Sequence, residues 1–191
     1  MGNNFPKLQT IKKSLDLDVL SFWRWSASDL VSNATRGILA EYIVATALGL
    51  SDGLREEWDA IDFRTKDNIK IEVKSASYIQ SWHHANLSKI TFGIQPTRAW
   101  DAMTNLLAVE IQRQADIYIF CLLAHKDQET LDPLNLNQWE FYFLPTSVLN
   151  ASCPTQKTIG LASLLKFGAI KANYDEIGKC INRIVETNFP S

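Results

Sequence analysis

Residues 61–75 of the chain read IDFRTKDNIKIEVKS, in which two short runs of alternating apolar and polar residues flank a polar turn. Successive side chains of a β-strand point to opposite faces, so the second run places Glu72 and Lys74 together, away from its isoleucines and valine. By the same alternation Asp62, between two apolar residues, projects from the polar face of the first run. We therefore expect a hairpin that gathers two carboxylates and a lysine on one face. Such a group can hold a divalent metal ion beside a reacting phosphate.

A third carboxylate lies upstream, in a segment with strong helix signals. Asn33 is a suitable N-cap, apolar residues recur at helical spacing, and Gly49 is a good stop. Glu41 lies in the middle of this helix, with Gly37 and Ala45 four residues to either side on the same face. These small neighbours would let the carboxylate approach another element. The competing interpretation is that Glu41 is exposed to solvent, as a glutamate in mid-helix usually is.

Periodicity predicts further elements around the hairpin. A near-continuous apolar run at 117–123 is typical of a central strand that is covered on both faces. Pro96 marks a break before 98–111, where apolar residues at helical spacing predict a helix. The other expected elements are strands at about 58–64, 69–79, 89–94 and 139–144, a helical segment within 10–31 and a helix at 174–187. The order of helix, three strands, helix and strand predicts an α/β sheet with a right-handed crossover into the buried strand.

The composition is that of an ordinary globular protein. Of 191 residues, 46% are apolar and 21% are charged, and no linker divides the chain, so we expect a single domain over 1–191. A net charge of −2 gives no global basic field that would attract nucleic acid. The three cysteines form no metal-binding pair, and no apolar run is long enough to span a membrane. The start of the chain does not read as a signal peptide. These features predict a soluble, cytoplasmic protein that does not associate with membranes.

The order of elements and the placement of the acidic residues and the lysine resemble the PD-(D/E)XK superfamily, the restriction-endonuclease-like nucleases. The resemblance covers about 33–124 and leaves 125–191 as an added strand and helices. It implies a restriction-endonuclease-like α/β core (helix, three strands, helix, strand) with extra N- and C-terminal helical elements. It also implies a nuclease that acts on DNA, depends on Mg²⁺ with Mn²⁺ as a substitute, and works as a homodimer, as relatives commonly do.

The functional positions of the superfamily map onto this chain residue by residue. Its metal-binding Asp maps onto Asp62 and its Glu onto Glu72, and the main-chain carbonyl of Val73 would join them as a ligand. Its active-site Lys maps onto Lys74, which would position the attacking water and stabilise negative charge near the scissile phosphate. The first-helix Glu of many members maps onto Glu41, which would help to hold a second ion or orient a metal-bound water.

Two features leave other interpretations open. The chain has Ile61 where a proline often precedes the metal-binding Asp, and Asp59 is a rival for that role, although its parity would place it on the opposite strand face. An E-x-K triplet also arises by chance about once in a chain of this size, so Glu72 and Lys74 could be the solvated face of a strand. Two alternatives therefore remain: an inactive module of the same fold that binds DNA or a protein partner, and a structural protein with surface charges at these positions.

Further candidates lie around this core. Gln80 shares the parity of Lys74 if the strand continues that far, and a glutamine near the motif binds a phosphate or a metal-bound water in some relatives. Basic side chains position a nucleic acid through its phosphates whatever its sequence. The candidate phosphate contacts are Arg36, Lys70, Lys89 and Arg98. Each of these residues could equally be solvated.

Overall fold

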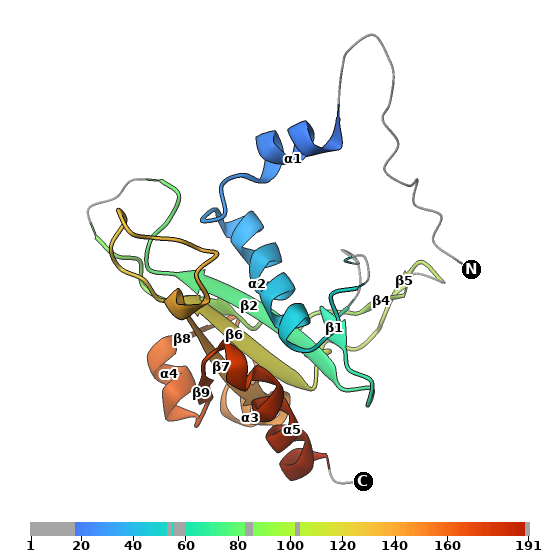
Figure 1. Ribbon diagram of the computed structural model, residues 1–191. Helices are drawn as coiled ribbons and strands as arrows, with labels where there is room; N and C mark the ends of the chain where they lie inside the picture. The colour runs from blue at the N-terminus through green and yellow to red at the C-terminus, as the bar shows by residue number, and fades with distance from the viewer. Residues whose placement is uncertain (1–17, 53–54, 56–59, 83–85, 102–103, 190–191) are drawn as a thin grey trace.

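The apolar run at 117–123 forms the centre of a five-stranded mixed sheet in a computed structural model (Figure 1). The residues described by the structure are 18–52, 55, 60–82, 86–101 and 104–189. The sheet has the order β1-β2-β6-β7-β9, formed by β1 (Phe63–Arg64), β2 (Lys70–Ser77), β6 (Ile117–Leu123), β7 (Trp139–Pro145) and β9 (Ile170–Ala172). β2 and β6 run parallel, and the other neighbouring strands are antiparallel. Every residue of β6 is buried, which confirms the prediction of a central strand covered on both faces.

One face of the sheet is covered by two helices, α2 (Asn33–Ala47) and α5 (Ile177–Asn188). The odd-numbered residues of β2 and β6 point to this side, where Ile71 and Val73 pack with Ile43 and Val44 of α2. Because α2 packs directly on β2, the helix that carries Glu41 lies against the strand that carries Glu72 and Lys74.

The other face is covered by a second, separate layer. It consists of the two-stranded sheet of β3 (Thr91–Gly93) and β8 (Thr158–Gly160), with α3 (Thr146–Ser152) and α4 (Leu161–Lys166). The even-numbered residues of β6, Tyr118 and Phe120 among them, pack here against Phe92 of β3 and Leu149 of α3. The sheet is therefore a central layer between two apolar cores, and Glu72 and Lys74 of β2 lie on the side of the second core.

The helix before the hairpin forms as predicted, with a small shift at its start. Ser32, rather than Asn33, is the N-cap, and its hydroxyl accepts a hydrogen bond from the backbone N–H of Thr35 at 3.4 Å. Gly49 has a φ of 65°, the left-handed conformation in which glycine commonly ends a helix. The strand at 139–144 is confirmed as β7, and the C-terminal helix is confirmed as α5 after a 3₁₀ turn at Tyr174–Glu176.

The predicted helix at 98–111 is wrong. The segment instead forms a hairpin of β4 (Trp100–Asp101) and β5 (Leu106–Leu107), closed at its base by a bridge between Thr97 and Gln112. Asn105 has a φ of 55°, which no residue of a right-handed helix adopts. The apolar residues of this hairpin are exposed because the second face of the main sheet is already covered by β3, β8, α3 and α4.

The hairpin at the candidate site is shorter than predicted, and the third strand lies elsewhere. β1 covers only Phe63–Arg64, residues 60–62 bend, and residues 56–59 lie outside the described part of the chain. The predicted strand 89–94 exists as β3, but it pairs with β8 and is not a member of the main sheet, because Phe92 is buried on the face of that sheet. The main sheet gains β7 and β9 instead, both beyond residue 124.

An N-terminal helix, α1 (Val19–Ala27), stands apart from the sheet in Figure 1, and none of its side chains is buried. Residues 10–17 of the predicted helical segment lie outside the described residues. Within the described ranges, no helix combines the length and the apolar character that a membrane crossing requires.

Candidate active site

The site begins where β1 leaves the edge of β2. The two strands pair only at Phe63 with Ile71 and at Arg64 with Lys70, and the chain bends immediately before that. At the bend the backbone N–H of Asp62 donates to the carbonyl of Ile71 at 3.1 Å. The carboxylate Oδ2 of Asp62 then accepts a hydrogen bond from the backbone N–H of Val73 at 2.6 Å. At the open edge of β2, the Asp62 side chain thus accepts a backbone hydrogen bond that a neighbouring strand would otherwise accept.

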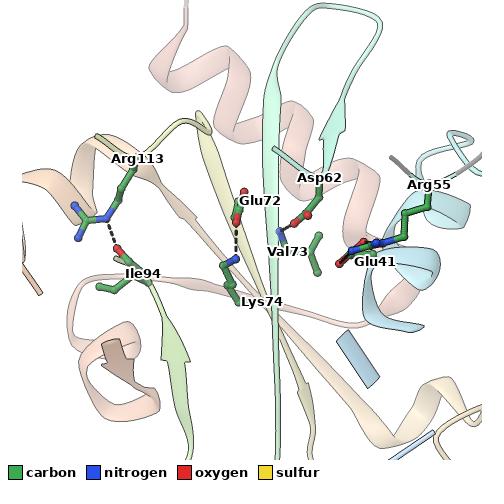
Figure 2. A network of polar contacts seen from close by, with 8 residues as sticks. All are labelled: Glu41, Arg55, Asp62, Glu72, Val73, Lys74, Ile94 and Arg113. Atoms are coloured by element: carbon green, nitrogen blue, oxygen red, sulfur yellow. Dashed lines mark hydrogen bonds and ion pairs between the residues drawn. The ribbon is translucent and has the colours of Figure 1, made fainter. Parts of the chain in front are cut away.

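The bend changes how Asp62 meets Glu72. Ile61 packs in the core on one side of the sheet and Phe63 in the core on the other, so the regular alternation predicted for 61–63 is wrong. In Figure 2, Glu72 points to one side of the β2 ribbon, whereas Asp62 lies on the other side with Glu41. The two carboxylates do not project side by side from one strand face. They approach each other around the edge of β2 instead.

Glu72 and Lys74 lie on the same face of β2 and form an ion pair between Oε1 and Nζ. Their side chains are only 18% and 34% exposed, so the interpretation of a fully solvated strand face does not describe them. Both line a cleft of about 240 Å³. Tyr118, which is opposite Glu72 in the register of β2 with β6, forms part of the same wall. The cleft gives a substrate access to the lysine and to one carboxylate.

Glu41 approaches the same edge from α2. Its side chain is 14% exposed, so the competing interpretation of an exposed mid-helix glutamate is wrong. Oε2 of Glu41 forms an ion pair with Nε of Arg55, and Oε1 accepts a hydrogen bond from the second guanidinium nitrogen at 3.1 Å (Figure 2). The helix thus brings a third carboxylate to the site, held by a cation.

The electrostatics of the site are dominated by carboxylates. Burial, and then the negative charges of Glu72 and Glu41, raise the pKa of Asp62 to about 7, against a usual value near 4. The hydrogen bond from Val73 and the charge of Lys74 oppose this rise in the pKa only in part. The same field reaches Tyr118, whose pKa is raised by burial first and by Glu72 next. Asp62 therefore binds a proton near neutral pH, where an ordinary aspartate would be charged.

Whether these residues fit a metal ion follows from their chemistry. Among the described residues, no three His, Cys, Asp or Glu side chains lie together in an arrangement that could hold a metal. Lys74 and Arg55 instead hold two of the three carboxylates. Hard oxygen donors and a surplus of negative charge nevertheless suit Mg²⁺, and a bound cation would remove the cause of the raised pKa of Asp62. The N–H and C=O of one strand residue point to the same edge, so the carbonyl of Val73 points to the edge of β2 at which its N–H bonds Asp62.

Gln80 does not join this group. β2 ends at Ser77, so the strand on which its shared parity with Lys74 depended is not continued. Its amide nitrogen donates to the carbonyl of Ser77 at 3.0 Å and to the hydroxyl of Ser88 at 3.2 Å. Gln80 lies at a second hollow beyond the end of the strand.

The four predicted phosphate contacts differ in their surroundings. Arg36 is only 3% exposed, and it donates to the carbonyl of Val31 and to Asn33, each at 2.7 Å, so it stabilises the start of α2 and is turned away from solvent. Lys70 is half-buried at the first position of β2. Lys89 and Arg98 are exposed, and Arg98 directly follows Thr97, which lines the cleft.

Several residues of the site gave no usable signal in the sequence. Gln95, Thr97 and Gln114 line the cleft, but they belong to a segment around the misassigned helix. Arg113 is 6% exposed and donates to the carbonyls of Ile94 and Cys153, both at 2.8 Å, which fixes one wall of the cleft. Asp59, the rival to Asp62, lies outside the described residues.

Two comparisons with known proteins bear on this site. The family model for bacteriophage T4 endonuclease IV matches residues 8–163, about four-fifths of the chain. The matched segment contains Glu41, Arg55, Asp62, Glu72 and Lys74 and all of the strands β1 to β8. A search of curated proteins finds no match to the chain.

Proposed function

The chain belongs to the bacteriophage T4 endonuclease IV family, and from this premise we propose that it is a divalent-metal-dependent nuclease that cuts DNA at a PD-(D/E)XK site. The core of the proposed site is Asp62, Glu72 and Lys74, with Glu41 as a third carboxylate. One observation carries the proposal most directly: the pKa of Asp62 is raised to about 7 by burial and by two nearby carboxylates. A protein maintains such a concentration of negative charge at a cost in stability, which points to a function that needs it.

The residues that would hold the metal are Asp62, Glu72 and the carbonyl of Val73, with Glu41 at the side of α2. When bound, Mg²⁺ or Mn²⁺ supplies neutralisation of charge on the phosphate and an activated water. The chain itself would place these oxygens at the edge of β2. Metal binding would also require the ion pairs Glu72–Lys74 and Glu41–Arg55 to open.

Lys74 is the group that would contact the substrate. Its ammonium lies in the cleft beside Glu72, and once that ion pair opens it can donate to an oxygen of the scissile phosphate. Tyr118, itself buried, forms part of the cleft wall beside Glu72. Arg98 and Lys89, both exposed, are the proposed contacts to flanking phosphates, and Lys70 is a third candidate.

A second candidate function is favoured by a different observation. Lys74 and Arg55 already neutralise Glu72 and Glu41, two of the three carboxylates of the site. That arrangement would suit an inactive nuclease-fold module that binds DNA or a protein partner. The metal requirement separates the two functions, since such a module need not bind Mg²⁺.

The experiment is cleavage of supercoiled plasmid and of labelled single-stranded and branched DNA in Mg²⁺, in Mn²⁺ and in EDTA. The nuclease proposal predicts cleavage that requires the metal and is lost in Asp62→Ala and Glu72→Ala. Lys66→Ala, an exposed lysine in the turn between β1 and β2, serves as the control and should cut like the wild type. If no substrate is cut under any condition while DNA is still bound, the inactive module becomes the better account.

A further inference from the structure

A second hollow, of about 270 Å³, lies beyond the ends of the two parallel strands of the sheet. β2 ends at Ser77 and β6 at Leu123, which are partners in the register. Tyr78, Gln80 and Trp82 line the hollow after the first strand, and Lys126 lines it after the second. The crevice outside the carboxyl ends of parallel strands is where α/β proteins commonly bind their ligands.

The lining of the hollow includes two aromatic side chains and one lysine, beside amide and aliphatic side chains. The indole of Trp82 is 56% exposed. Nζ of Lys126 lies 4.7 Å from the centre of the Tyr78 ring, over its face. An aromatic surface beside a cation is suited to a ligand that combines a flat ring with a negative charge, which describes a nucleotide.

The wall of the hollow is held in place by hydrogen bonds at its base. The backbone N–H of Ser88 donates to the carbonyl of Tyr78 at 2.8 Å, and the Gln80 amide joins Ser77 to the Ser88 hydroxyl. These hydrogen bonds hold Ser88 beside Tyr78 and Gln80. Gln80 is therefore a positioning residue for this hollow, which differs from the catalytic role that its spacing from Lys74 suggested.

The hollow and the cleft of the candidate active site lie on the same side of the sheet, separated by the buried side chain of Ala76. Tyr78 packs against the same core as Tyr118 and Phe120, on the face to which Glu72 and Lys74 point. Tyr78 follows the end of β2 and lies four positions after Lys74, about 13 Å if each step is extended by about 3.3 Å. That distance corresponds to about four nucleotides at the axial spacing of a duplex strand, and to fewer in an extended one.

We infer that this hollow is a subsite for one nucleobase of the DNA, out of its stack, with the base on Trp82 and its phosphate at Lys126. The inference rests on the proposed function, since it makes the hollow part of the path of the same substrate. It assigns the position of the base, two to four nucleotides from the scissile bond by the spacing above, and leaves the identity of the base unspecified.

The test is the binding of a fluorescein-labelled single-stranded oligonucleotide, measured by anisotropy in EDTA, with a set of probes that carry one abasic nucleotide at successive positions. Stacking of this kind predicts an affinity loss of about 5- to 150-fold for Trp82→Ala, and little loss for Trp82→Phe. Trp25→Ala, which removes an 86% exposed indole from α1, is the matched control and should bind like the wild type. Lys126→Ala should reduce the slope of log affinity against log salt by about 0.7.

The abasic probes give the decisive comparison. The wild type should bind one or two of the abasic probes more weakly than the intact probe, and Trp82→Ala should bind all of them equally. Wild-type affinity in Trp82→Ala, with no sensitive position, would overturn the subsite and leave the nuclease proposal intact. If the wild type neither binds nor cuts DNA, the proposed function fails and the subsite fails with it.

Discussion

At the scale of single residues, the proposed metal site depends on Asp62. Its carboxylate accepts a hydrogen bond from Val73 at the open edge of β2 and lies within the fields of Glu72 and Glu41. The sequence predicted this residue as a metal ligand from its spacing, because the E-x-K triplet and the preceding Asp are visible in the order of residues. It misplaced the side chain on the strand face, because the bend at 60–62 depends on the packing of Ile61 and Phe63 into opposite cores.

The first residue-scale prediction concerns the stability of the metal-free protein. The pKa of Asp62 is about 7 in the folded state and near 4 in the unfolded state, so the folded protein retains a proton that the unfolded chain loses between these values. Stability should therefore fall as the pH rises from about 4 to about 7, by an amount on the order of 4 kcal/mol. The Asp62→Asn substitution keeps an oxygen acceptor for Val73 and removes this loss.

The measurement is urea denaturation of both proteins in EDTA between pH 4 and pH 8. We expect Asp62→Asn to be more stable than the wild type at pH 8 and to lose that advantage at pH 4. Asp67→Asn, in the exposed turn after β1, is the control and should track the wild type. A constant difference between Asp62→Asn and the wild type across the range would contradict the raised pKa.

The second residue-scale prediction distinguishes the role proposed for Lys74 in cleavage from the role proposed for the carboxylates in metal binding. Lys74→Ala should lower kcat for DNA cleavage by about 100- to 1000-fold, the loss typical of one group that stabilises transition-state charge. Metal binding should persist in this variant, because the substitution frees Glu72 from its ion pair. Single-turnover cleavage and metal titration of the same preparation check both statements, and loss of metal binding in Lys74→Ala would contradict the role given to the lysine.

At the scale of elements, the sequence predicted those whose signals are local. The caps and the apolar stripe of α2, and the uninterrupted apolar run of β6, depend on a few adjacent residues. The hairpin β4–β5 was misassigned because its exposed apolar residues happen to recur at helical spacing, and a helix requires a face to cover. That face of the sheet is occupied by β3 and β8, whose pairing joins residues almost 70 positions apart in the chain. Such long-range pairing leaves no local pattern.

One prediction at this scale concerns Arg113, which joins the cleft wall to α3 and the loop after it. The guanidinium contacts the carbonyl of Ile94, the side chain of Asn150 and the carbonyl of Cys153, at 2.8, 2.7 and 2.8 Å. Arg113→Met would leave these buried acceptors unpaired, and we expect a loss of about 2 to 4 kcal/mol in the free energy of unfolding. Arg183→Met, on the exposed side of α5, should change stability by less than about 0.5 kcal/mol. If chemical denaturation shows an equally small change in the free energy of unfolding for both substitutions, the contacts of Arg113 contribute little to stability.

At the scale of the whole molecule, the sheet separates two apolar cores and the site lies at its edge, between α2 on one face and the cleft on the other. This placement puts Asp62 and Glu41 on one side of the β2 edge and Glu72 on the other. The resemblance to PD-(D/E)XK nucleases also predicts a homodimer. Sedimentation velocity at several protein concentrations tests this prediction: a species of twice the chain mass is expected, and a single species of one chain mass at all concentrations would contradict it.

We propose that Asp62 and Glu72 together hold a divalent metal ion. Calorimetric titration of the metal-free protein with Mn²⁺ tests this claim most directly, in the wild type, Asp62→Asn, Glu72→Gln and the control Asp67→Asn. We expect binding in the wild type and in Asp67→Asn, and its loss in both Asp62→Asn and Glu72→Gln. Unchanged Mn²⁺ binding in those two variants, or no binding in the wild type, would contradict it.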